Sequence, residues 1–131
     1  MPAEPRERLR FGRDRRLRAA GEFARLKVQG QRLAQGCLVL NWQPVPAGSP
    51  SRLGVITSRK VGNAVARARA RRLLREAFRQ NQFRIVPPAK LVLVARPSIA
   101  PQPFAAVERD FLQALRRARL LAATVVVSKP I

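Results

Sequence analysis

The sequence predicts a single-domain α+β sandwich with the element order αβββαβα. The chain has 131 residues, of which 47% are hydrophobic, and this is enough for one modest core but not for two. A long helical pattern in the middle of the chain is preceded and followed by strand patterns. We therefore expect that helix to cross over the sheet, burying one face and offering the other to a partner.

The first half of the chain is predicted to form an arm, a short helix and strands. Residues 1–18 are rich in Pro and Arg and lack an apolar period, so we expect a basic arm that is at most partly ordered. The folded domain spans 19–122 and opens with a helix at 19–28 that ends near Gly30. A strand is predicted at 33–42 around Cys37 and another at 52–58, with an exposed turn at 44–50 between them. These patterns locate two of the three strands expected before the long helix.

The second half is predicted to contain two helices and one strand. Asn63 is the expected N-cap of the long helix, which runs to Arg79. The continuous apolar run at 91–95 is typical of a strand that is buried on both faces. Residues 123–131 are expected to form a tail or a short edge strand. A final helix is predicted at 104–122, and its apolar side is Val107, Phe111, Leu115 and Leu121.

The net charge of +20 indicates a polyanionic partner, because so much positive charge repels itself in a compact protein. The charge is concentrated in residues 59–79, which hold eight basic residues and one acid. Arg outnumbers Lys by 23 to 4, which favours bidentate contact with phosphate. No helix-turn-helix, zinc pattern or basic zipper is visible, and a sheet with a crossover helix suits RNA better than DNA.

Several residue types that catalysis uses are missing or scattered. The chain has no His, and its seven acids form no cluster. Glu108 and Asp110 are close in sequence but lie at i, i+2 on a predicted helix and so face different ways. We therefore assign no catalytic residue, metal site or protein-bound cofactor to the chain. Cys37 is expected to be a buried small hydrophobe in a reducing compartment, and without a membrane span or signal sequence the protein is expected to be soluble and cytoplasmic.

The long helix divides into an apolar face and an arginine face when its residues are projected at about 100° each. Arg67, Arg71, Arg75 and Arg79 recur at i, i+4 and form one ridge, whereas Arg69 and Arg72 lie on the next. Like charges at this spacing destabilise an isolated helix by about 0.2–0.5 kcal/mol per pair, and a bound phosphate chain would offset that cost. The predicted core face consists of Ala66, Ala70, Leu73, Leu74, Ala77 and Phe78.

Residues 52–79, RLGVITSRKVGNAVARARARRLLREAFR, closely resemble the protein subunit of bacterial ribonuclease P. That family carries a basic helix motif of the form Arg-Asn-Arg-x-x-(Lys/Arg)-x-x-Arg-Glu, preceded by a strand, a Lys-rich turn and Gly-(Asn/Lys)-Ala-Val. Phe23, Gly30 and the apolar strand at 91–97 extend the resemblance over residues 16–120. It implies an α+β sandwich in which a left-handed βαβ crossover carries the basic helix.

The resemblance also implies a function and its residues. The family binds a catalytic RNA and the single-stranded 5′ leader of precursor tRNA, which the ribonucleoprotein removes by endonucleolytic hydrolysis with magnesium held on the RNA subunit. The leader cleft of the family matches Phe23, Val39, Arg67, Arg71 and Arg75. The positions associated with the catalytic RNA match Arg59, Lys60, Arg69 and Arg72.

Three departures from the family pattern bear on how the leader is bound. Ala68 replaces the Asn of the motif, Lys27 replaces a second aromatic on the first helix, and Asn41 replaces a strand Tyr. The cleft is therefore expected to stack fewer bases and to depend more on charge. Two other classes of protein share the basic composition: a structural ribosomal protein, which is the main alternative, and a basic protein that compacts DNA or lies on a membrane surface.

Overall fold

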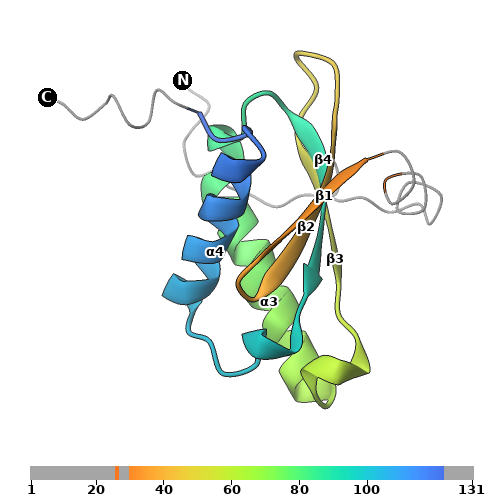
Figure 1. Cartoon of the computed structure of the whole chain (residues 1–131), viewed down its shortest axis with the longest axis vertical. Coiled ribbons are helices and arrows are strands. Elements are labelled where there is room, and N and C mark those ends of the chain that lie inside the picture. Colours follow the sequence, from red (N-terminus) through yellow and green to blue (C-terminus); the bar gives the residue numbers. More distant parts are fainter. Residues whose placement is uncertain (1–25, 27–29, 123–131) are drawn as a thin grey trace, which may run out of the picture.

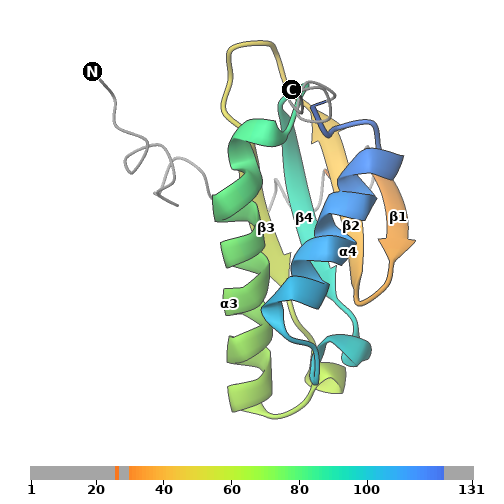
Figure 2. The ribbon, with the colours of Figure 1, turned by 90° about the vertical axis from the view of Figure 1, so that its left-hand side faces the viewer.

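The computed structural model describes Leu26 and residues 30–122. Four strands form one sheet with the spatial order β1-β2-β4-β3, and two helices cover one face of it (Figures 1 and 2). The strands are β1 (Gln31–Gln35), β2 (Leu38–Pro44), β3 (Arg52–Ile56) and β4 (Ala89–Ala95). The helices are α3 (Ala64–Asn81) and α4 (Phe104–Arg117), and single 3₁₀ turns occur at η2 (Arg59–Val61), η3 (Gln82–Arg84) and η4 (Pro97–Ile99). This is the predicted α+β class.

The central helix forms a crossover, as the sequence predicted. β3 and β4 are parallel neighbours and α3 connects them, whereas β1 with β2 and β2 with β4 are antiparallel. β4 pairs on both sides, and its residues 91–93 are buried, which confirms the strand predicted at 91–95. Within the described residues, no helix is both long enough and apolar enough to cross a membrane.

The strand predicted at 33–42 is wrong, because this segment is a hairpin of two strands. Gly36 turns the chain with a φ of 53°, a left-handed conformation that glycine adopts without strain. Leu33 consequently pairs with Leu40 across the hairpin. Cys37 is buried as expected, but it lies in the turn rather than within a strand. The hairpin supplies the third strand of the predicted βββ order.

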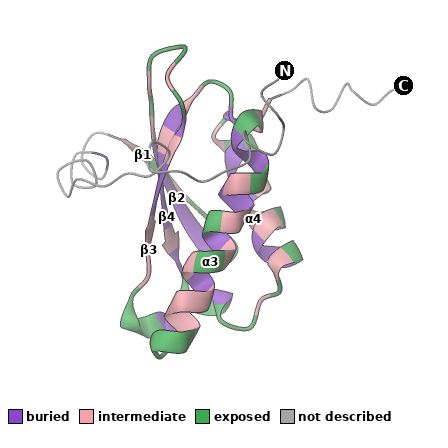
Figure 3. Cartoon of the chain, turned by 180° about the vertical axis from the view of Figure 1, so that it is seen from behind, coloured by how far each residue is buried: buried purple, intermediate pink, exposed green. Residues whose placement is uncertain are grey.

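The main core lies between the sheet and the two helices (Figure 3). Leu38, Leu40 and Trp42 of β2 contribute to it, because alternate residues of a strand face the same side. Four residues of the predicted core face of α3 are fully buried, and Ala66 and Leu73 are partly buried. The buried four are Ala70, Leu74, Ala77 and Phe78.

The last helix ends earlier than predicted, at Arg117 instead of residue 122. Arg119 takes a φ of 62°, which turns the chain away from the helix axis. Leu121 then pairs with Ile85 in an isolated bridge, so its apolar side chain does not extend the helix face as predicted. Val107, Phe111 and Leu115 are buried as expected.

Several predicted features lie outside the described residues. They include the arm at 1–18, the tail at 123–131, and the side chains of Phe23 and Lys27. Leu26, the one described residue of the predicted helix at 19–28, is helical and buried against Val92.

Candidate RNA-binding surface

The arginine-rich helix begins at a defined cap. The Asn63 side chain accepts a hydrogen bond of 2.9 Å from the Ala66 backbone N–H, which confirms the predicted N-cap. Arg67, in the first turn, donates to the Gly62 carbonyl at 2.8 Å. Arg59 and Lys60 are exposed on η2, directly before this cap. The basic turn and the start of the helix therefore form one continuous surface.

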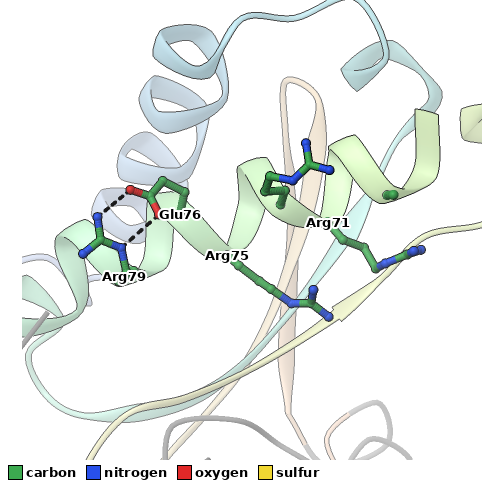
Figure 4. Close-up of a pocket in the computed structure, with 6 residues that line it drawn as sticks. Arg71, Arg75, Glu76 and Arg79 are labelled. Carbon is green, nitrogen blue, oxygen red and sulfur yellow. Dashed lines mark hydrogen bonds and ion pairs between the residues drawn. The ribbon is translucent and has the colours of Figure 1, made fainter. Parts of the chain in front are cut away.

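Arg71 and Arg75 point from α3 toward the same side, next to β3 (Figure 4). Arg71 donates to the Thr57 hydroxyl at 2.9 Å, and Thr57 directly follows the last residue of β3. Because the two arginines are one helical turn apart, their guanidinium groups are arranged along the helix axis. This is the ridge that the sequence projection predicted.

A shallow groove between the two predicted ridges runs along α3 (Figure 4). Ala68 is one of the residues that line this groove. The groove therefore has a methyl group at the position where the family motif has the side-chain amide of Asn. Glu76 is the only acid in the lining, and it binds Arg79 at 2.6 Å. Hydrogen bonds from Arg79 and Gln80 lower the pKa of Glu76 to about 2. The groove is therefore electropositive, with one arginine partly neutralised. Its full lining is Ala68, Arg71, Arg72, Arg75, Glu76 and Arg79.

Arg69 differs from the other arginines because it is bound to the loop before α4. Its guanidinium donates to the Ala100 carbonyl at 3.0 Å and to the Gln102 carbonyl at 2.6 Å. The exposed Arg72 makes no side-chain hydrogen bond or ion pair within the described part of the chain. Two of the four residues matched to the catalytic-RNA positions are thus in different situations: Arg69 holds two elements together, and Arg72 faces solvent.

Val39 lies on the sheet face opposite α3 and α4. It pairs with Val94, which pairs in turn with Ile56 of β3, so the three residues form a row across this face. A cavity of about 300 Å³ beside the row is lined by Arg32, Asn41, Ile56 and Val94. The structure therefore separates Val39 from the arginine ridge by the thickness of the sheet.

The two surfaces meet at the end of β3. Ile56 lines the cavity on one side, and the next residue, Thr57, accepts the hydrogen bond from Arg71 on the other. A single-stranded RNA that lay along the ridge could pass this edge of the sheet and reach the cavity. The sequence did not identify Thr57 or Arg32 as part of this surface, because only the strand order β1-β2-β4-β3 brings them there.

Comparisons with known proteins agree with this geometry. The family described as ribonuclease P matches residues 11–119. The ribonuclease P protein component of Desulfatibacillum aliphaticivorans is 35% identical over 104 residues, covering 78% of this chain and 87% of that protein. The same component of Roseiflexus is 37% identical over 110 residues, covering 83% and 89%. The solved ribonuclease P protein of Thermotoga maritima superposes with a TM-score of 0.69 at 29% identity, covering 78% of this chain and 96% of that one.

Proposed function

This chain belongs to the ribonuclease P protein family, and from that premise we propose that its arginine ridge and the sheet surface beyond β3 bind the 5′ leader of precursor tRNA. The protein is the protein component of ribonuclease P, a ribonucleoprotein endonuclease of tRNA processing. Its partner is the ribonuclease P RNA. The alternative of a structural ribosomal protein is thereby set aside.

The observation that carries the leader proposal is the contact between Arg71 and Thr57. It joins the ridge to the cavity that Asn41 and Arg32 line, so one extended strand can contact both. Guanidinium groups neutralise its phosphates along α3. On the sheet face, Asn41 is buried and its amide nitrogen donates to the Val92 carbonyl at 3.4 Å, which fixes the side chain for contact with a base.

We assign binding of the catalytic RNA to the surface next to the ridge. Its exposed side chains are Arg59, Lys60 and Arg72. These side chains lie on η2 and on the outer side of α3. Arg69 supports this surface by fixing the loop before α4 against α3. Two RNAs that both approach α3 repel each other, and arginines between them lower that repulsion.

Hydrolysis of the phosphodiester bond is assigned to the RNA subunit, which we expect to hold the magnesium ions. The protein raises the affinity for the precursor over the mature product, because only the precursor carries a leader. It also supports magnesium occupancy indirectly, because bringing the two RNAs together concentrates phosphate charge. We place this activity in the cytoplasm.

The test is reconstitution of the protein with a bacterial ribonuclease P RNA and measurement of precursor and mature tRNA affinity. Arg71→Ala is expected to weaken precursor binding by more than it weakens mature tRNA binding. Arg116→Ala is the matched control, because Arg116 is an exposed arginine on α4, away from the ridge. Equal losses for both tRNAs with Arg71→Ala would contradict leader binding by the ridge.

A further inference from the structure

A second groove lies at the C-terminal end of α3, outside the surface described so far. It has a volume of about 460 Å³ and runs between the loop after β2 and the turn η3. Figure 2 shows that this loop and the end of α3 lie at the same end of the molecule. Its walls include Gly48, Ser49 and Ser51 on the loop side and Phe83, Ile85 and Pro88 on the other.

Phe83 is the main apolar group of this groove that faces solvent. Its side chain is 42% exposed, although phenylalanine is usually buried. The facing wall carries the hydroxyl groups of Ser49, which is half-buried, and Ser51, which is buried and accepts a hydrogen bond from the Ala89 N–H at 3.1 Å. A flat apolar ring opposite hydroxyl groups matches a nucleobase, which has a π-face and polar edges.

The groove lies beyond the end of α3 at which the arginine ridge stops. Phe83 follows Arg79 by four residues and lies in η3, which begins directly after α3 ends at Asn81. β3 runs antiparallel to α3 beside the ridge, from the groove, where it follows Ser51, to Thr57, which binds Arg71. An RNA strand on the ridge therefore reaches the groove without crossing another element.

We propose that the groove binds one unpaired base of the leader, with Phe83 as its stacking surface. The inference rests on the proposed function, because the ridge must first hold the strand. Arg71 and Phe83 are twelve residues apart, which corresponds to about 18 Å along a helix. At about 3.4 Å per stacked nucleotide, at most about five nucleotides separate the two contacts. The base in the groove is therefore a fixed short distance from the phosphate at Arg71.

The experiment uses the enzyme reconstituted with a bacterial ribonuclease P RNA. A series of precursor tRNAs is used, each with one abasic nucleotide at a different position of the leader. Each position is counted from the cleavage site, which gives all the leaders a common numbering. With the unaltered protein, one abasic position is expected to weaken binding by about 5- to 150-fold, the usual range for one stacked base. With Phe83→Ala, the affinity for the precursor with an unmodified leader is expected to fall by the same factor. The abasic nucleotide at that position is then expected to lower the affinity no further.

Two variants make the result specific. Val86→Ala removes exposed apolar surface next to the groove, since Val86 is 53% exposed and is not part of the lining, and it should leave the abasic profile unchanged. Phe83→Leu keeps an apolar side chain without the ring, and it should reproduce the Phe83→Ala profile. Unaltered affinity with Phe83→Leu would overturn stacking as the source of binding.

The remaining outcomes separate the two proposals. If the abasic profile is the same with Phe83→Ala as with the unaltered protein, and Arg71→Ala still weakens precursor binding, the base site is refuted and leader binding by the ridge stands. If Arg71→Ala changes neither tRNA affinity, both fall. If Phe83→Ala abolishes self-association in sedimentation experiments and leaves RNA binding intact, the groove is an interface between copies and the base site is refuted.

Discussion

Replacing Arg69 with Ala should destabilise the protein more than replacing any exposed arginine of α3. Arg69 donates to the carbonyls of Ala100 and Gln102, in the loop that leads into α4. α4 has Pro103 at its N-cap, which makes no side-chain hydrogen bond to the helix start. The contact from Arg69 is thus a principal support for the entrance to α4.

The magnitude follows from two charge-assisted hydrogen bonds. Each is worth about 1.5–3 kcal/mol when it is shielded from water. Arg69 is partly exposed, so water replaces part of each bond in the variant, and about 1–3 kcal/mol is expected for the pair. With a urea dependence of about 1.5–2 kcal/mol/M, the unfolding midpoint should fall by about 0.5–2 M.

The assay is urea unfolding followed by fluorescence of Trp42, the single tryptophan, which is 7% exposed. Arg72→Ala is the matched control, and its free energy of unfolding should stay within about 0.5 kcal/mol of the unaltered protein. The reasoning is refuted if Arg69→Ala unfolds at the same urea concentration as Arg72→Ala. If that variant instead binds ribonuclease P RNA more weakly at unchanged stability, Arg69 acts as an RNA contact and not as a support.

Three further predictions concern charge and the buried thiol. If about five phosphates are neutralised on a single strand, log K should fall with log salt at a slope near −3.5. Glu76→Gln removes the ion pair that partly neutralises Arg79 and should steepen this slope by about 0.7, and an unchanged slope would contradict a role of Glu76 in limiting phosphate contact by Arg79. The pKa of Glu76 is depressed from 4.5 to about 2, so ionised Glu76 raises the free energy of unfolding above that of Glu76→Gln. This difference should be complete above pH 4.5 and should vanish as the pH falls toward 2, which acid unfolding of both proteins measures. Burial, together with Asp110, raises the pKa of the Cys37 thiol to about 12, so alkylation at pH 8 should be slow in the folded protein and fast in denaturant; equal rates would contradict this burial.

The sequence predicted α3 well because the determinants of α3 are local. Asn63 caps the helix, apolar residues recur at helical spacing, and the arginines between them take the opposite face. Glu108 and Asp110 likewise face apart: the first accepts from Asn81, and the second accepts from the Cys37 backbone N–H. Helical periodicity was sufficient in each case.

What could not be predicted depends on contacts between distant segments. The turn at Gly36 interrupts a run of residues whose pattern predicts one strand. The Asp110 carboxylate on α4 accepts a hydrogen bond from the Cys37 N–H in that turn. The role of Arg69 depends on carbonyl groups about thirty positions away. The cavity opposite the helices exists because β4 inserts between β2 and β3, which periodicity does not encode.

The position of β4 also determines when this protein can fold. β2 and β3 do not pair with each other, and β3 is joined to the β1–β2 hairpin only through β4, which is the last strand along the described part of the chain. During synthesis, β3 and α3 therefore emerge before the strand that they pack with, and the arginines of α3 are exposed on an incomplete domain. Nonlocal pairing of this kind slows folding. A nascent chain that ends before Ala89 should consequently lack the four-stranded sheet, since β3 has no neighbour, and only the emergence of β4 allows the cooperative unit to form.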